Sequence, residues 1–188
     1  SQFLSIPEEQ RHSMGLRALD LSKVQPRAFA ENSQKPILEV RNLSLFYKKK
    51  LVLDDLNLSA APGEIIGIIG HNGAGKSTFS RTLCGLHTNC TGQILWDGKE
   101  LNAKSRLKRS YMVMQDVSYQ LFADTLEKEC VFGIKHPDLD AAKQAMERLG
   151  IYEYRTHHPN TLSGGQKQRA AVAVSMVCRK DVLIFDEP

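Results

Sequence analysis

Gly70-His71-Asn72-Gly73-Ala74-Gly75-Lys76-Ser77 is the stretch of this sequence that decides the fold. The apolar run over residues 64–69 predicts a strand before it, and residues 76–85 favour a helix after it. A strand, a glycine-rich loop and a helix in this order form a phosphate-binding loop, in which backbone N–H groups and the positive helix end face the phosphates. A chance match of this motif is expected in about one chain in a hundred.

The loop assigns roles to its own residues. Lys76 is expected to hold β- and γ-phosphate oxygens of ATP, and Ser77 to coordinate Mg²⁺. The other loop residues expected to contact the nucleotide are Gly70, Asn72, Gly73, Gly75 and Thr78.

A second polar pair follows the last apolar run, residues 181–186, which predicts another strand. Asp186 at its end is expected to reach the Mg²⁺ ion, and Glu187 to polarise a water for attack on the γ-phosphate. An Asp-Glu pair by itself is usually only a strand end. The phosphate loop is what favours the catalytic interpretation here.

Leu162-Ser163-Gly164-Gly165-Gln166 precedes a predicted helix over residues 165–178. A serine hydroxyl, exposed N–H groups and a helix dipole together bind an anion. The alternative is an ordinary serine N-cap followed by glycines. Because the loop of Lys76 already covers one side of the γ-phosphate, a second phosphate-binding motif suggests the face of a second site.

Over residues 37–188 the three motifs resemble the ATP-binding cassette of ABC transporters. The resemblance implies a head-to-tail dimer in which Ser163, Gly164, Gly165 and Gln166 close over the ATP held by a second cassette. Half of each of two sites would then come from this chain.

The same resemblance gives roles to two more residues. Gln115, which ends a predicted strand over residues 110–114, matches the family's Q-loop glutamine, which senses Mg²⁺ and the attacking water. Tyr47 resembles the aromatic residue that stacks on adenine, although packing in a strand and the neighbouring Phe46 are alternatives.

Residues 115–122, with the sequence Gln-Asp-Val-Ser-Tyr-Gln-Leu-Phe, resemble the ATPases of energy-coupling factor transporters, which import vitamins and cobalt or nickel ions. In that family this region faces a transmembrane coupling subunit, so the resemblance implies a peripheral protein on the cytoplasmic face of the membrane. A surface turn with apolar residues is the alternative for the segment. The alternative function is a soluble ABC protein acting on ribosomes or nucleic acid, and a regulatory cassette without catalysis is disfavoured by the intact Lys76 and Glu187.

The expected fold class is α/β: a P-loop NTPase core of the ABC type with an N-terminal antiparallel β subdomain and an inserted helical subdomain. Strands are predicted over residues 37–40, 43–47, 52–58 and 92–96, and helices over 125–132, 140–149 and 165–178. Residues 36–188 would form the ATP-binding domain, with the helical insert at about 116–160. Residues 1–35 are expected to be a linker or the tail of a preceding domain, with a short helix over 7–19.

Composition adds limits to these functions. The net charge of +4 is spread along the chain, which gives no argument for a nucleic-acid partner. Four cysteines at irregular spacing fit reduced thiols, and the longest apolar run is far short of the ~20 residues of a membrane span. We expect the chain to be part of a longer polypeptide, because it begins without an initiator Met and ends directly after a predicted strand, before the family's switch histidine. Some members of the family carry two cassettes in one chain, and residues 1–35 fit the junction before the second cassette of such a tandem protein. Alone, it is expected to bind ATP weakly and hydrolyse it poorly.

Overall fold

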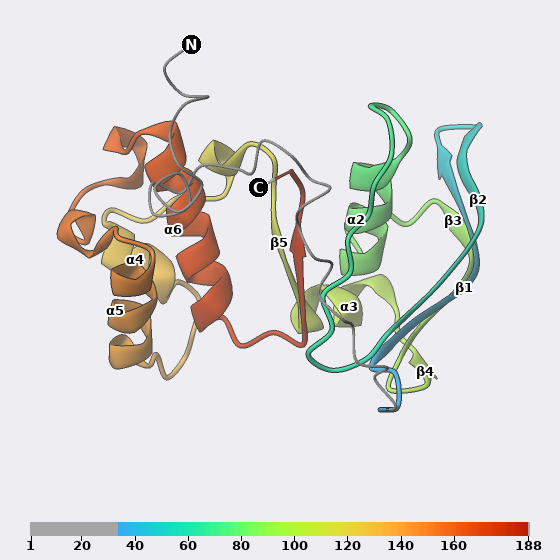
Figure 1. Cartoon of the computed structure of the whole chain (residues 1–188), viewed down its shortest axis with the longest axis horizontal. Helices are drawn as coiled ribbons and strands as arrows, with labels where there is room; N and C mark the ends of the chain where they lie inside the picture. The colour runs from blue at the N-terminus through green and yellow to red at the C-terminus, as the bar shows by residue number, and fades with distance from the viewer. Residues whose placement is uncertain (1–33, 188) are drawn as a thin grey trace, which may run out of the picture. The chain divides into compact units, whose positions relative to one another are not determined.

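The computed structural model describes residues 34–187 (Figure 1). The expected linker and the helix over residues 7–19 lie outside this range, except for residues 34 and 35. Within it the chain forms an antiparallel sheet, a pair of parallel strands and a group of helices. This mixed α/β architecture with an N-terminal antiparallel sheet confirms the predicted fold class.

The antiparallel sheet has the strand order β2-β1-β3-β4, with β1 at Leu38–Tyr47, β2 at Lys50–Ala60, β3 at Cys90–Trp96 and β4 at Lys99–Glu100. β1 joins two stretches that the sequence predicted as separate strands. The register shifts between Val40 and Leu43, and Asn42 there has a φ of 47°. This irregularity keeps Val40 and Leu43 on the buried face although they are three positions apart, a spacing that would place them on opposite faces of a regular strand.

Helix α2 (Lys76–Cys84) packs on this sheet and carries the phosphate loop at its N-terminus (Figure 1). Phe79 and Leu83 are buried in one cluster with side chains of β1 and β3, such as Leu45 and Trp96. The predicted helix over residues 76–85 is thereby confirmed. Because its buried face is fixed on the sheet, the position of the loop in front of it is fixed as well.

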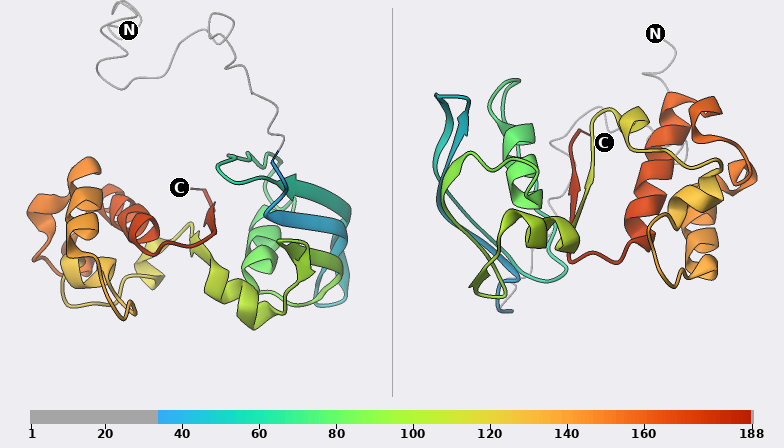
Figure 2. Two further views of the ribbon diagram at one scale, coloured as in Figure 1. Left: turned by 90° about the horizontal axis from the view of Figure 1, so that it is seen from below. Right: turned by 180° about the vertical axis from the view of Figure 1, so that it is seen from behind.

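Strands β5 (Ser110–Val113) and β6 (Val182–Phe185) lie side by side (Figure 2). They run parallel, with Val113 opposite Phe185. Both strands were predicted from their apolar runs. The carboxyl ends of parallel strands meet at one edge of a sheet. The residues that follow β5 and β6 are therefore neighbours, although they are distant in sequence.

The prediction of a strand over residues 64–69 is wrong. This segment has no place in either sheet of residues 34–187, and Ile65 and Ile69 are 92% and 98% exposed. A groove of about 720 Å³, lined by Ile65, Ile68, Phe185 and other residues, adjoins both this segment and β6. Apolar composition alone does not make a strand, since the backbone also needs a partner edge within hydrogen-bonding reach.

Helices α4 (Leu126–Cys130), α5 (Leu139–Arg148) and α6 (Gly164–Val177) share a second apolar core (Figure 1). All three were predicted, with ends that differ by one or two residues. The sequence did not predict α3 (Ala103–Arg109) or the 3₁₀ helices η3 (Val117–Tyr119), η4 (Tyr152–Tyr154) and η5 (Pro159–Thr161). These elements are too short to show a periodic apolar pattern.

The end of α2 gives a stability prediction. Gly85 has a φ of 85°, and a Cβ there would overlap the backbone carbonyl of Ala103. Gly98 has a φ of 75°, but among the described residues nothing lies within 4 Å of its Cβ position. Gly98→Ala is expected to lower the unfolding free energy by about 1–2 kcal/mol, the penalty for left-handed backbone alone. Gly85→Ala should cost about 1–3 kcal/mol more, because the contacting loop must move. Urea denaturation followed by circular dichroism measures both, and equal costs would contradict the contact.

Candidate nucleotide-binding site

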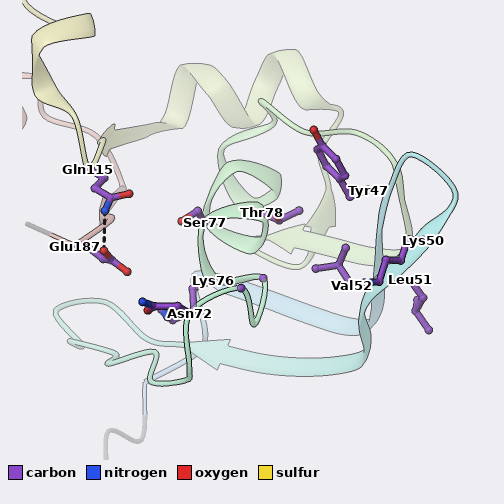
Figure 3. Close-up of a pocket in the computed structure, with 12 residues that line it drawn as sticks. Tyr47, Lys50, Leu51, Val52, Asn72, Lys76, Ser77, Thr78, Gln115 and Glu187 are labelled. Atoms are coloured by element: carbon purple, nitrogen blue, oxygen red, sulfur yellow. Dashed lines mark hydrogen bonds between the residues drawn. The ribbon is translucent and has the colours of Figure 1, made fainter.

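A cavity of about 590 Å³ opens at the N-terminus of α2 (Figure 3). This volume is in the usual range for small-molecule sites. Sequence reasoning predicted nine of its lining residues as site residues: Tyr47, Asn72, Gly73, Gly75, Lys76, Ser77, Thr78, Gln115 and Glu187. It missed Lys50, Leu51 and Val52 of β2, because strand residues with no motif carry no functional signal.

The phosphate loop is shaped by its contact with β2. Gly75 has a φ of 93°, and a Cβ there would lie 2.7 Å from Cγ1 of Val52, so only glycine fits. Lys76 Nζ donates to the carbonyl oxygens of Gly70, at 2.9 Å, and His71, at 3.1 Å. The ammonium group therefore lies over the loop, within reach of phosphate oxygens entering there. Gly70, also predicted as a site residue, is not among the residues that line the cavity, and its carbonyl contacts the side chain of Lys76.

Ser77 and Asp186 are brought together across the core. Ser77 Oγ donates to Asp186 Oδ1 at 3.0 Å, and Asp186 is 7% exposed. The backbone N–H of Asp186 donates to the carbonyl of Val113 at 2.9 Å, which ties the carboxylate to β5. The hydroxyl and the carboxylate offer two oxygen ligands here, and Mg²⁺ prefers oxygen ligands and also binds substrate phosphates. Among residues 34–187 no group of three or more His, Cys, Asp or Glu could hold a metal ion.

The two predicted catalytic side chains also meet. Gln115 Nε2 donates to Glu187 Oε2 at 2.9 Å, shown by the dashed line in Figure 3. Gln115 follows β5 and Glu187 follows β6, so the parallel pairing of the strands produces this contact. Glu187 has a φ of 52°, which is uncommon for a residue other than glycine. Its exposed carboxylate lines the cavity, where it can accept a proton from a water.

Tyr47 is 63% exposed and lines the cavity, whereas Phe46 is half-buried. The turn at Tyr47 is held by residues that follow α2. Phe46 N donates to the Asn89 carbonyl at 3.0 Å, and the Asn89 side chain donates to the Lys48 carbonyl at 2.8 Å. His87 Nε2 lies 2.9 Å from the Phe46 carbonyl. The sequence gave no signal for His87 and Asn89, because isolated polar residues in a loop belong to no motif.

The motif at Leu162–Gln166 lies elsewhere, since none of Ser163, Gly164, Gly165 and Gln166 is among the residues that line this cavity. Ser163 caps α6: its N–H donates to Gln166 Oε1 at 2.7 Å, and Gln166 N donates to Ser163 Oγ at 3.4 Å. Within the described chain nothing lies within 4 Å of a Cβ on Gly164, and Gly165 meets only Arg169 at 3.8 Å. The fold itself does not require these glycines, which leaves room for a ligand to approach the backbone from outside.

Three buried or half-buried cysteines are poorly suited to take part in this chemistry. Burial raises the pKa of Cys84 and Cys178, and raises that of Cys130 to about 12. The thiolate is the reactive form, so these thiols are poor nucleophiles at neutral pH. Within residues 34–187 no helix is both long and apolar enough to cross a membrane.

Fold and site together define a P-loop nucleotide-binding protein of mixed α/β architecture. Residues 53–188 match the family described as ABC transporter, so the chain belongs to that family, whose cassettes bind ATP. It is 44% identical, over 99% of its length, to a Treponema denticola protein assigned to the ABC transporter ATP-binding proteins. The chain covers only 39% of that relative.

Two further relatives have more specific names. The energy-coupling factor transporter ATP-binding protein EcfA1 of Streptococcus sanguinis is 36% identical over 80% of this chain and 59% of its own length. The structure of cbiO1 from Clostridium perfringens, a part of the ABC transporter complex cbiONQ, aligns with a TM-score of 0.72 and 30% identity. That alignment covers 82% of this chain and 66% of cbiO1.

The exposed ring of Tyr47 leads to a prediction on nucleotide affinity. Tyr47→Ala is expected to raise the Kd for ATP about five- to hundred-fold, since stacking of a base on an aromatic ring contributes ~1–3 kcal/mol. Tyr47→Phe keeps the ring and is the matched control, with an unchanged Kd. Both variants should unfold at the wild-type temperature because the side chain is largely exposed. Calorimetric titration measures the affinities, and an unchanged Kd for Tyr47→Ala would rule out stacking.

Proposed function

We propose that this chain is an ATP-hydrolysing subunit that powers transport across a membrane. The observation that carries the proposal is the contact of Gln115 with Glu187 beside that of Ser77 with Asp186, at the phosphate loop. One pair supplies oxygen ligands for Mg²⁺ and the other a carboxylate and an amide for the attacking water. Such a set serves phosphoryl transfer to water better than nucleotide binding alone.

In this mechanism Tyr47 holds the adenine, while the loop N–H groups and Lys76 hold the phosphates. Ser77, Asp186 and Gln115 would hold Mg²⁺, which neutralises charge on the β- and γ-phosphates when bound. Glu187 orients a water and accepts its proton as that water attacks the γ-phosphate. The dipole of α2 favours the negative charge at its N-terminus throughout.

We further propose that residues 163–166 bind the γ-phosphate of ATP held by a second cassette, in a head-to-tail dimer. Two observations support this: these residues do not line this chain's own cavity, and the fold does not require their glycines. The second cassette is a copy of this chain, a different chain or another part of the same polypeptide. The proposed ATP-binding domain covers residues 36–188, with the helical insert at about 116–160 and a linker or tail before it.

Within the family we propose an energy-coupling factor ATPase, which imports a vitamin or a metal ion together with a transmembrane coupling subunit at the cytoplasmic face of the membrane. The sequence of residues 115–122 and the relatives named EcfA1 and cbiO1 support it. The alternative is a soluble ABC protein acting on ribosomes or nucleic acid. Co-purification with small membrane proteins would favour the first, and with ribosomes the second.

Glu187→Gln tests the catalytic base. In the full-length protein this change should lower ATP turnover by a factor on the order of 10²–10⁴, because the amide cannot accept the proton of the water. ATP binding should persist, since Lys76 and Tyr47 are untouched. Glu127→Gln, the same change at an exposed position of α4, is the control. Phosphate release measures turnover, and a wild-type rate in Glu187→Gln would exclude this carboxylate as the base.

Mixing two inactive variants tests the shared site, if the chain pairs with a copy of itself. Lys76→Ala removes the phosphate ligand, and Gly165→Asp places a negative charge beside the partner's γ-phosphate without a clash in its own chain. Each variant alone should be inactive. In a mixed dimer one site carries both defects and the other carries none, so a one-to-one mixture should recover about a quarter of the wild-type ATPase activity. A mixture without any recovery would contradict a site shared between two copies.

A further inference from the structure

Gln120 makes two side-chain hydrogen bonds that the mechanism above does not use. Its Nε2 donates to the Met112 carbonyl at 2.6 Å, and its Oε1 accepts from the Met114 N–H at 2.7 Å. A carbonyl and the N–H two residues later point to the same side of a strand. The Gln120 amide therefore bonds to β5 as a neighbouring peptide group would.

The opposite side of β5 belongs to β6 and the catalytic carboxylates. The carbonyl of Val113, between the two residues bonded to Gln120, accepts from Asp186 N at 2.9 Å. Residues 112–114 are thus bonded from both sides, by Gln120 and by the chain that leads to Glu187. The backbone that carries Gln115 starts directly from this doubly bonded segment.

The two bonds also close a short loop. The chain leaves β5 at Gln115, forms η3 and returns to β5 through the side chain of Gln120. Val117 is the buried residue inside this loop, whereas Gln115 is exposed and its position depends on the backbone and on its bond to Glu187. Beyond the loop, Glu129 of α4 accepts from the N–H groups of Phe122 and Ala123, both at 2.6 Å. Gln120 therefore fixes the segment next to the catalytic pair, through its bonds to β5. Glu129 fixes the segment that leads into the helices.

We propose that Gln120 is a positioning residue for ATP hydrolysis: its amide closes the loop of residues 115–120 on β5 and so directs Gln115 to Glu187 and the attacking water. The proposal rests on the function assigned to Gln115 above. The chemistry requires glutamine here, because glutamate has no donor for the Met112 carbonyl and methionine has neither donor nor acceptor for the backbone.

The test is a double-mutant cycle on ATP turnover in the full-length protein with Gln120→Met, Gln115→Ala and both changes together. Gln120→Met should lower kcat about ten- to hundred-fold, the effect of a misplaced catalytic group. The KM for ATP should not change, because Gln120 contacts neither the phosphate loop nor Tyr47. The double variant should be no slower than Gln115→Ala, since the loop acts through Gln115. Gln144→Met, the same change at an exposed site on α5, is the control and should match the wild type.

Several results would overturn the proposal. These are a wild-type kcat in Gln120→Met, a change in KM alone, or a double variant whose loss is the product of the two single losses. If Gln120→Met does not fold, the same cycle is run with Gln120→Glu, which keeps the bond from Met114 N–H and should give an intermediate kcat. A wild-type kcat in Gln115→Ala would instead contradict the role of Gln115 in the proposed function. If Gln115→Ala turns over ATP at the wild-type rate and Gln120→Met does not, Gln120 acts by a route other than Gln115, and the proposal is wrong.

Discussion

The parallel pairing of β5 with β6 is the constraint on which the site depends. Its register places Val113 opposite Phe185, and the bond from Asp186 N to the Val113 carbonyl extends that register by one residue. The side chains beyond it then have little choice of neighbour, so Gln115 meets Glu187 and Asp186 meets Ser77. A shift of one residue would turn Asp186 to the opposite face and separate both pairs. The site thus uses the side-chain alternation of two short strands to align groups that are 72 and 109 positions apart in sequence.

Helix α2 also positions site residues, because it is fixed on the antiparallel sheet. Its apolar face, with Phe79 and Leu83, is fixed on the antiparallel sheet, while its polar end presents the loop. The loop residues after α2, at Asn89 and His87, bond to the turn of Tyr47, so one helix sets the position of both ends of the proposed nucleotide site. The glycines follow from this arrangement. Gly75 is forced by Val52 of β2, and Gly85 by the carbonyl of Ala103.

The site residues that could be predicted from the sequence are those that belong to a motif with a recognisable spacing. The phosphate loop, the Asp-Glu pair and Gln115 could be placed because each follows a recognisable apolar run, and the cavity contains most of them. Residues that act through tertiary hydrogen bonds could not be found: Gln120 and Asn89 bond to backbone carbonyls that only the folded chain brings near. The strand prediction for residues 64–69 was wrong for the same reason, because it too depends on tertiary contacts. Periodicity reports which side chains prefer burial, whereas a strand also depends on a partner backbone, which a local pattern does not contain.

The polar side chains of the site already have partners within the chain, which bears on how a nucleotide can bind. Lys76 bonds to two loop carbonyls, Ser77 to Asp186, and Gln115 to Glu187. Hydrogen bonds to charged groups contribute about 1.5–3 kcal/mol each, so Mg²⁺ and phosphate gain affinity only by the surplus over the bonds they replace. The contact of Gln115 has the further property that it occupies the carboxylate proposed as the base. A bound nucleotide that draws Gln115 away would free Glu187 for water at the same step, and the stiffness of the loop at Gln120 then decides how far Gln115 can move.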